Sequence, residues 1–379
     1  MNTLPLPNHP CFDANASHAH ARIHLPVAPR CNVQCNYCNR KFDCVNESRP
    51  GVASAVLTPA QALAYVREAD AKIKNLSVVG IAGPGDPFAN PKETLLTLRL
   101  IKQAFPDKLF CVSTNGLNLV PYIDELCDIG VSHVTLTINA VDPVVSSKIY
   151  AWVKADSRIL KGLEGANFLL DQQLSSLSLL QQRGIKVKVN SVVIPAVNDF
   201  HIQEVAKRAG QLGAATMNVI PLLPTLHTPF ANFTEPDKQL IATIRDSCRE
   251  FLPIMSHCKR CRADAIGILG NDNKEMMERM EYFSQKSTGN YPSPPRPYVA
   301  VATSNALLVD QHLGEAVSFH VFEKNGKGFN LVDVRQAPPT GQSDLRWIRL
   351  AKSLIDCKAL IVVKAGPNPQ FILENRVWQ

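Results

Sequence analysis

A short cysteine-rich segment constrains this chain more than any other feature of its sequence. Cys31, Cys35 and Cys38 have the spacing C-x3-C-x2-C, with a tyrosine directly before the last cysteine. Three thiolates so close in sequence can bind three corners of a cubane [4Fe–4S] cluster, which leaves the fourth iron without a protein ligand. An open iron of this kind can bind the amino and carboxylate groups of S-adenosylmethionine (SAM) and pass an electron to its sulfonium. The alternative is a structural zinc site, but such sites have a closed shell of four ligands.

The remaining cysteines also point to metal ligation rather than to disulfides. The chain has 379 residues and 11 cysteines, an odd number that is unevenly clustered. No N-terminal segment has the pattern of a targeting peptide, and no apolar stretch is long enough to span a membrane. We therefore expect a cytoplasmic protein whose thiols stay reduced. The net charge of +7 is spread along the chain, which favours an ordinary solvated surface over nucleic-acid binding.

Apolar runs and helical patterns alternate through most of the chain. The β-type runs lie near residues 22–28, 76–82, 109–114, 132–138, 185–193 and 214–220. The helical patterns lie near residues 58–70, 91–105, 120–129, 167–183 and 199–211. The first helix has its start signal in the sequence: Thr58 as N-cap, Pro59 at the first position and Gln61 three residues after the cap. Six such units predict an α/β fold with a parallel sheet and outer helices, and a partial barrel fits this count better than a closed one of eight strands.

Glycine-rich and polar segments follow the predicted strands, at the barrel end where chemistry gathers in such folds. The cysteine segment follows the first strand, Gly83-Pro84-Gly85-Asp86 the second, Asn115-Gly116 the third and Asn139 the fourth. These motifs resemble the radical-SAM superfamily, which has C-x3-C-x2-C in a partial (β/α)6 barrel and a glycine-rich stretch beside the methionine part of SAM. The resemblance implies that SAM is bound by Tyr37, Gly85, Asp86, Thr114, Asn115, Asn139 and Val192. An ordinary turn or strand-end role is the alternative for each strand-end residue.

Five further cysteines lie in suggestive places. Cys258 and Cys261 form a C-x2-C pair, which by itself fits half a zinc site, a redox pair or surface thiols. Cys11, Cys44 and Cys111 are lone cysteines, and a lone cysteine is often an inert core residue. Cys44, however, is in the same loop as the cysteine segment, and Cys111 is on the third predicted strand, within reach of the barrel interior.

His24 belongs with these cysteines by its position in the first strand. It alternates with Ile23 and Leu25, so its side chain is expected on the opposite side of the strand from their apolar side chains. A buried, hydrogen-bonded histidine without a ligand role is the alternative.

Taken together, these residues and their neighbours closely resemble the NifB family of radical-SAM proteins over about residues 9–265. The matching segments are His9-Pro10-Cys11-Phe12, residues 30–44, 46–52, 82–86 and 113–116, and the stretch from Cys258 to Asp264. Members of this family build the 8-iron precursor of the nitrogenase cofactor. They fuse two [4Fe–4S] clusters and insert a SAM-derived carbide and a sulfur, which is lyase or transferase chemistry.

The resemblance implies one SAM-binding cluster and two substrate clusters. The implied ligand sets are Cys31, Cys35 and Cys38 for the SAM-binding cluster; His24, Cys44 and Cys111 for one substrate cluster; and Cys11, Cys258 and Cys261 for the other. Conversion of a methyl group to carbide needs bases, and Glu47 is our candidate, with a solvated surface glutamate as the alternative. The implied partners are Fe–S cluster donor proteins, nitrogenase cofactor scaffold or carrier proteins as product acceptors, and an electron donor such as a ferredoxin. Cys127, Cys248 and Cys357 match no ligand position.

A proline-rich segment at residues 291–297 breaks the pattern, as a linker would. The sequence after it resembles the small α/β domain of the NifX type, a ribonuclease H-like fold that binds nitrogenase cofactor precursors. We thus expect an N-terminal extension (1–21) with one cluster ligand, a radical-SAM barrel with a C-terminal cluster-binding segment (22–265), a helix and linker (266–297) and a NifX-like cofactor-binding domain (298–379).

Two other functions compete with this interpretation. One is another radical-SAM enzyme with auxiliary clusters, such as a molybdenum-cofactor cyclase or a peptide-modifying enzyme, but those families usually have a longer C-terminal cysteine series. The other is a non-enzymatic Fe–S carrier, which would need neither an open-iron motif nor SAM loops.

Overall fold

The computed structural model describes residues 9–46, 55–156, 158–286, 296–305, 308–326, 328–341 and 343–376. The chain forms two compact units, residues 1–288 and 289–379. Within the described part, no helix is both long enough and apolar enough to cross a bilayer. The finer boundaries that the sequence suggests, after residues 21, 265 and 297, stay predictions.

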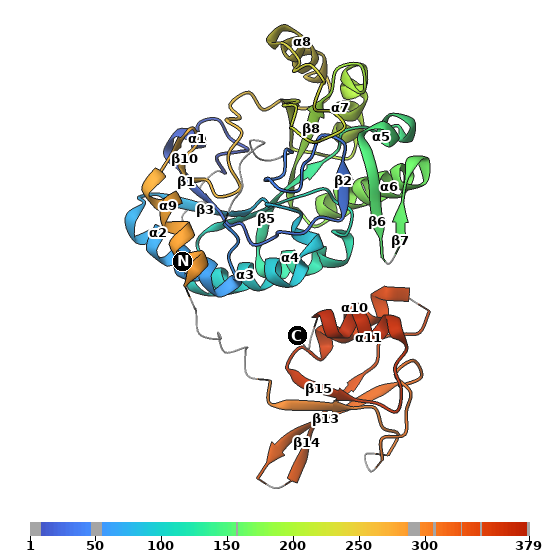
Figure 1. The fold of residues 1–379 in the computed structure, drawn as a ribbon. Coiled ribbons are helices and arrows are strands. Elements are labelled where there is room, and N and C mark those ends of the chain that lie inside the picture. The colour runs from blue at the N-terminus through green and yellow to red at the C-terminus, as the bar shows by residue number, and fades with distance from the viewer. Residues whose placement is uncertain are drawn as a thin grey trace. The chain divides into compact units, whose positions relative to one another are not determined.

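Six parallel strands form the centre of the first unit, as the alternating pattern predicts (Figure 1). They are β1 (Ala21–His24), β3 (Leu76–Ile81), β4 (Leu109–Thr114), β5 (Val131–Thr137), β8 (Lys186–Val193) and β9 (Thr216–Pro221). Two short strands extend the sheet beyond β1. β10 (Ile266–Ile268) is antiparallel to β1, and β11 (Asn271–Asp272) is antiparallel to β10, so the order is β11-β10-β1-β3-β4-β5-β8-β9. The fold is a partial barrel of the expected α/β class, whose sheet order begins at β11 and ends at β9.

Helices cover the outer face of this sheet. They are α2 (Pro59–Lys72), α3 (Pro91–Ala104), α4 (Ile123–Ile129), α6 (Gly162–Gln182), α7 (Ile202–Gln211), α8 (Lys238–Cys248) and α9 (Lys274–Gln285). Shorter helical elements are α1 (Ala16–Ala19), α5 (Pro143–Ile149) and the 3-10 turns Pro87–Ala89, Val120–Tyr122 and Asp199–His201. The predicted start of α2 is confirmed, because Thr58 Oγ1 accepts from the Gln61 amide and Gln61 Oε1 accepts from the Thr58 amide. The largest buried apolar cluster fills the space between the strands and these helices.

A second, three-stranded antiparallel sheet was not expected from the sequence. It consists of β2 (Val33–Cys35), β6 (Tyr150–Ala155) and β7 (Arg158–Leu160). Cys35 pairs with Tyr150 across this sheet. The cysteine segment is therefore held in part as a strand and not as a free loop.

The second unit is a small α/β domain, as the sequence predicts. It contains β12 (Tyr298–Val301), β13 (Ser318–Asn325), β14 (Gly328–Gln336), α10 (Ser343–Ser353), β15 (Cys357–Ile361) and α11 (Pro367–Arg376). The sheet order is β14-β13-β12-β15. Both helices pack on one face of the sheet, around a core that includes Phe319, Val321, Leu350 and Leu373.

Candidate functional site

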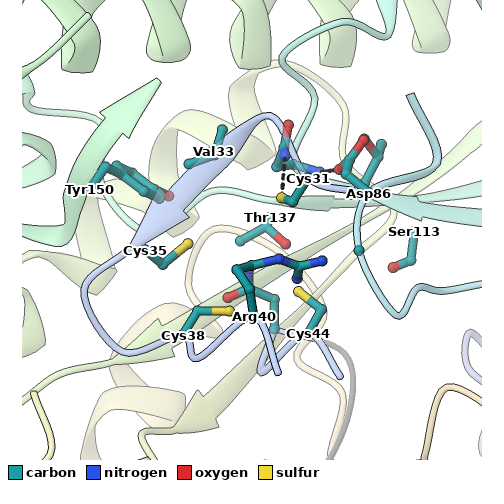
Figure 2. A pocket seen from close by; sticks show the side chains of 14 residues that line it. Cys31, Val33, Cys35, Cys38, Arg40, Cys44, Asp86, Ser113, Thr137 and Tyr150 are labelled. Carbon is teal, nitrogen blue, oxygen red and sulfur yellow. Dashed lines mark hydrogen bonds between the residues drawn. The ribbon is translucent and has the colours of Figure 1, made fainter. Parts of the chain in front are cut away.

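The cysteine segment lines a pocket at the carboxyl ends of the barrel strands. The pocket is lined by Cys31, Val33, Cys35, Cys38, Arg40, Cys44, Asn46, Gly85, Asp86, Ser113, Thr114, Asn115, Thr137 and Tyr150. Figure 2 shows the sulfurs of Cys31, Cys35, Cys38 and Cys44 around a common region of this pocket. Among the described residues, no three His, Cys, Asp or Glu side chains are arranged as ligands of a single metal ion. The thiols instead line different parts of the wall of one pocket.

Burial shifts the thiols of this pocket toward their protonated form. Burial raises the pKa of Cys31 to about 12 and that of Cys35 well above its usual value, and the neighbouring thiols add to the shift of Cys35. The Arg40 guanidinium acts in the opposite direction on both. In addition, the buried Ser113 hydroxyl has no hydrogen-bond partner among the described residues. Three clustered thiols and an unsatisfied hydroxyl on one pocket fit the iron–sulfur cluster with SAM that the sequence implies.

Contacts within the protein explain why residue 85 is a glycine. A Cβ at this position would lie 2.1 Å from the carbonyl oxygen of Arg30 and 2.8 Å from that of Ala28. The Gly85 amide also donates to the Ala28 carbonyl at 2.6 Å. The loop after β3 thus packs directly against the backbone that leads into Cys31.

Asp86 lines the pocket, but its carboxylate is occupied by internal hydrogen bonds. It accepts from the Phe88 amide (2.9 Å), the Asn115 amide (2.7 Å) and the Thr114 hydroxyl (2.9 Å). Burial raises the pKa of Asp86, and these hydrogen bonds oppose the shift. The Asn115 side chain donates to the Cys31 sulfur at 3.8 Å and to Asn32 Oδ1 at 2.7 Å. Asp86, Thr114 and Asn115 therefore form one network that fixes the edge of the pocket beside Cys31.

Tyr37, Asn139 and Val192 form a second buried network. Asn139 Nδ2 donates to the hydroxyls of Tyr37 (2.6 Å) and Tyr150 (3.1 Å), and its Oδ1 accepts from the Val192 amide (2.8 Å). The Tyr37 hydroxyl in turn donates to Asn46 Oδ1 at 2.7 Å. Of these predicted SAM contacts, Tyr37, Asn139 and Val192 do not line the pocket. Their observed role is to hold the cysteine segment against β5 and β8.

His24 and Cys111 meet across a glycine, in the barrel interior. Gly80 on β3 pairs in register with His24 on β1 and with Cys111 on β4. A Cβ at Gly80 would lie 2.9 Å from Cys111 Sγ and 3.1 Å from His24 Cδ2. The two side chains therefore flank the space that a larger residue would fill. The predicted direction of His24, opposite to that of the buried Ile23, is consistent with this arrangement.

The environment of His24 defines which of its ring nitrogens has a lone pair that could bind a metal. Its Nδ1 lies 3.1 Å from the carbonyl oxygen of Arg262. A carbonyl can only accept, so Nδ1 carries the proton and Nε2 has the lone pair. Burial lowers the pKa of His24 to about 4, with a further contribution from Arg22, so the ring is neutral near pH 7.

Cys44 lies in the pocket of the first three cysteines, whereas His24 and Cys111 do not line that pocket. An indirect connection exists through the segment after Cys261. Asp43, next to Cys44, accepts from the Ala263 amide at 3.4 Å, and His24 contacts the Arg262 carbonyl. Cys44 and His24 thus approach the same segment from two sides.

Cys11, Cys258 and Cys261 are brought together, although the first is far from the others in sequence. His257 Nε2 contacts the carbonyl oxygen of Pro10 at 3.0 Å. Burial raises the pKa of Cys261 to about 11; the Arg22 guanidinium acts against this shift, whereas Cys11 and Cys258 add to it. The thiols of Cys11 and Cys258 therefore both lie within electrostatic range of Cys261.

Several polar residues at these cysteines were missed in the sequence analysis. Arg22 is 1% exposed and donates to the Cys261 sulfur at 3.1 Å and to Asp272 Oδ1 at 2.6 Å. Asn218 Nδ2 donates to the Cys258 sulfur at 3.3 Å. Arg22 could have been noticed, since an arginine in an apolar strand needs buried partners, but no sequence signal connects Asn218 with Cys258.

The remaining candidate residues lie elsewhere. Glu47, the proposed base, is outside the described residues. Cys248 is buried in the apolar core of the barrel and Cys357 in that of the second unit, while Cys127 packs at the edge of the barrel core. These three are separate from the cysteine sets, as expected.

Family models match two parts of this chain. Residues 25–209 match the radical SAM superfamily, and residues 296–377 match the family described as "Dinitrogenase iron-molybdenum cofactor". A solved structure of SuiB from Streptococcus suis, bound to S-adenosylmethionine, has a TM-score of 0.46 and 14% identity, covering 63% of this chain and 51% of that one.

Full-length relatives extend the match over both units. The FeMo cofactor biosynthesis protein NifB of Chlorobaculum tepidum is 50% identical over 98% of this chain and 88% of its own length. The proteins of the same name from Klebsiella pneumoniae and Azotobacter vinelandii are 41% and 39% identical, each over 97% of this chain and over 85% and 83% of their own lengths. The chain therefore belongs to the NifB family, radical-SAM enzymes of FeMo-cofactor biosynthesis.

Proposed function

We propose that this chain fuses two [4Fe–4S] clusters into an 8-iron precursor of the nitrogenase cofactor, with insertion of a SAM-derived carbide and a sulfur. One observation carries the proposal: next to the thiol pocket, the fold gathers two further sets of soft ligands from distant parts of the chain. Cys111 lies beside His24 across Gly80, and the thiols of Cys11 and Cys258 both lie within electrostatic range of Cys261. A radical-SAM enzyme with only its resident cluster would need neither set.

Cys31, Cys35 and Cys38 would hold the resident cluster. When bound, this cluster and SAM would supply a methyl group and, by reductive cleavage of SAM, the radical chemistry that removes a hydrogen atom from that methyl group. The chain's own contribution is to fix the site: the Asp86 network holds Asn115 against the Cys31 sulfur, and Gly85 packs on the backbone before Cys31. Because Arg40 interacts with the thiols of this pocket, it would offset their negative charge.

His24, Cys44 and Cys111 would hold one substrate cluster. His24 suits this role because its neutral ring directs the lone pair of Nε2 away from the hydrogen bond at Nδ1. An imidazole is a weaker ligand for iron than a thiolate, so a set that includes one would release its cluster more easily. The approach of Cys44 and His24 to the same segment supports their joint assignment.

Cys11, Cys258 and Cys261 would hold the other substrate cluster. Two of their sulfurs accept hydrogen bonds, from Asn218 and from the Arg22 guanidinium. These contacts would orient the two sulfurs toward the cluster.

Further parts of the proposal rest on the family alone. Glu47 would act as a base in the formation of carbide, within lyase or transferase chemistry. The second unit would bind the cofactor precursor, and cluster donors, a cofactor scaffold or carrier, and a ferredoxin-type electron donor would be the partners.

The test is an anaerobic reconstitution of the full chain, followed by counting of iron and sulfide and by measurement of 5′-deoxyadenosine and S-adenosylhomocysteine. Three clusters correspond to about twelve irons, and both SAM products are expected. Cys111→Ser and Cys261→Ser should each lose about four irons and keep SAM cleavage. The matched control is Cys127→Ser, which should behave as wild type. Wild-type protein with about four irons, or without SAM cleavage, would contradict the proposal.

A further inference from the structure

His9 is a buried histidine before β1 to which the three ligand sets give no role. Only 4% of the residue is exposed. Its ring packs edge-on against Phe12, with centroids 5.1 Å apart, and lies 4.7 Å from the ring of His133 on β5. The imidazole is thus fixed in the barrel interior from two sides.

The hydrogen bond at Nδ1 determines where the ring carries its proton. Nδ1 accepts from the backbone amide of Cys11 at 3.1 Å. A nitrogen that accepts has no proton, so Nε2 is the N–H group. Nε2 is buried and has no hydrogen-bond partner among the described residues. Because a buried donor without an acceptor is costly and rare in native proteins, this N–H points to an absent acceptor.

His9 is connected to both proposed substrate sites, to one of them through His133. It is bonded to the amide of Cys11, a ligand of one set. Its ring neighbour His133 pairs in register with Cys111, a ligand of the other. The bond to Cys11 ties the ring to that ligand directly, whereas the connection to Cys111 passes through His133. The Cys11 site is therefore where the acceptor is to be expected.

We propose that His9 Nε2 donates a hydrogen bond to a sulfur of the substrate cluster held by Cys11, Cys258 and Cys261, as a positioning residue for that cluster. This inference rests on the proposed function. Cluster sulfides and ligating thiolates are hydrogen-bond acceptors, and such bonds raise the reduction potential of the cluster. His9 and His24 then have opposite roles: His24 directs a lone pair at iron and His9 directs a proton at sulfur.

Two substitutions separate this donor role from simple packing. His9→Phe keeps a ring against Phe12 and His133 but has no donor. His9→Gln has an amide N–H that can reach the position of the imidazole Nε2, without the ring. The control is His18→Phe, at an exposed position on α1. Each full-length variant is reconstituted anaerobically beside the wild type and compared in three measurements: the potentials of the clusters by EPR-monitored titration, the rate of iron loss to a chelator, and the unfolding temperature without clusters.

His9→Phe should shift the potential of one cluster downward and lose about four irons roughly fivefold faster, which corresponds to about 1 kcal/mol. His9→Gln should restore both values toward wild type, and His18→Phe should match wild type. A wild-type potential and iron loss in His9→Phe would overturn the proposal, as would equal defects in His9→Phe and His9→Gln. Failure of the proposed function has a different signature, since the wild type would then hold only about four irons.

A measurement on unsubstituted protein keeps the test decisive if His9→Phe does not fold. With 15N-labelled histidine, pulsed EPR of the wild type should resolve a weak histidine coupling from the hydrogen-bonded His9, beside the strong coupling of a ligating His24. The absence of any weak coupling would refute the donor role.

Discussion

His24 Nδ1 and the carbonyl oxygen of Arg262 are 3.1 Å apart, and this contact joins the first strand of the barrel to the segment that follows Cys261. It fixes the tautomer of His24 and, at the same time, the position of that segment. Arg22, two residues before His24, binds the sulfur of Cys261 itself. The strand β1 therefore organises residues of both proposed substrate sites, which gives the two sites a common rigid support.

The first prediction concerns the glycine between His24 and Cys111. Gly80→Ala would place a methyl group 2.9 Å from Cys111 Sγ and 3.1 Å from His24 Cδ2, so one or both ligands must move. We expect the variant to lose about four of about twelve irons while it still cleaves SAM, because the resident cluster is held by other residues. Iron counting and a 5′-deoxyadenosine assay measure the two effects.

Gly328→Ala is the matched control for Gly80→Ala. Its added Cβ would meet only Asn325 O, at 3.9 Å, in the second unit, and its iron content should equal that of the wild type. If Gly80→Ala also binds a full complement of iron, His24 and Cys111 do not hold a cluster together.

The second prediction addresses the support of the resident cluster. In Gly85→Ala the new Cβ would lie 2.1 Å from the Arg30 carbonyl, and backbone cannot move aside as a flexible side chain can. We expect a loss of about 2 kcal/mol of stability or more and loss of the resident cluster with its SAM cleavage. Gly314→Ala, whose nearest new contact is 3.5 Å away in a side chain, should change neither. Normal SAM cleavage by Gly85→Ala would show that the loop can shift without moving Cys31.

Much of the fold followed from local sequence patterns. Alternating apolar runs and helical periodicity predicted the six parallel strands, and the residues around Thr58 predicted the start of α2, because these signals act over a few neighbouring residues. The direction of the His24 side chain followed from strand parity for the same reason. The short β2–β6–β7 sheet was missed, since its pairing depends on contacts between segments far apart in sequence.

The roles of polar residues were harder to predict than their positions. Asp86 and Asn139 are predicted to contact SAM, and in the structure the side chains of both also have hydrogen bonds within the protein. A polar residue after a strand has the same sequence pattern whether it binds a ligand, a neighbouring loop or both, so the sequence alone does not separate these roles. The proximity of Cys11 to Cys258 and Cys261 likewise came from the family resemblance, because no local pattern encodes a contact over so long a separation.

The third prediction distinguishes a direct contact with SAM from a purely structural role of Asn139. This residue is fully buried and makes three hydrogen bonds, to Tyr37, Tyr150 and Val192. Asn139→Ala removes one buried hydrogen bond from each of the three partners, and we expect about 3 kcal/mol of destabilisation in denaturant unfolding of the cluster-free protein. Asn167→Ala, which removes an exposed hydrogen bond on α6, should cost far less. Wild-type stability combined with weakened SAM binding would instead support a direct SAM contact.

The fourth prediction is a pH dependence at the packing of α9 on α2. Glu68 on α2 accepts two hydrogen bonds of 2.9 Å from Arg279 on α9. Hydrogen bonds from Arg279 and Lys72 lower the pKa of Glu68. A lowered carboxylate pKa stabilises the fold above the unfolded value, about 4.3, and this stabilisation is lost as the pH falls through the folded value.

Glu68→Gln should therefore reduce the unfolding temperature slightly at pH 7, and the difference from wild type should shrink as the pH falls below about 4. The effect is small because the pair is partly exposed, with side-chain exposures of 22% and 37%. Glu281→Gln, an exposed substitution on α9, is the control. A difference between Glu68→Gln and wild type that grows at acid pH would contradict the assigned sign.

The last prediction concerns Arg22, whose guanidinium is buried between Cys261 and Asp272. Arg22→Met leaves the Asp272 carboxylate without its cation, and breaking such a buried pair costs about 3–5 kcal/mol. The double substitution Arg22→Met with Asp272→Leu removes both charges, so it should recover most of that stability in denaturant unfolding. Its iron content should nevertheless stay about four irons below wild type, because Cys261 still lacks its donor. Recovery of stability and iron together would mean that Arg22 serves only the ion pair; recovery of stability alone identifies it as a support of the ligand.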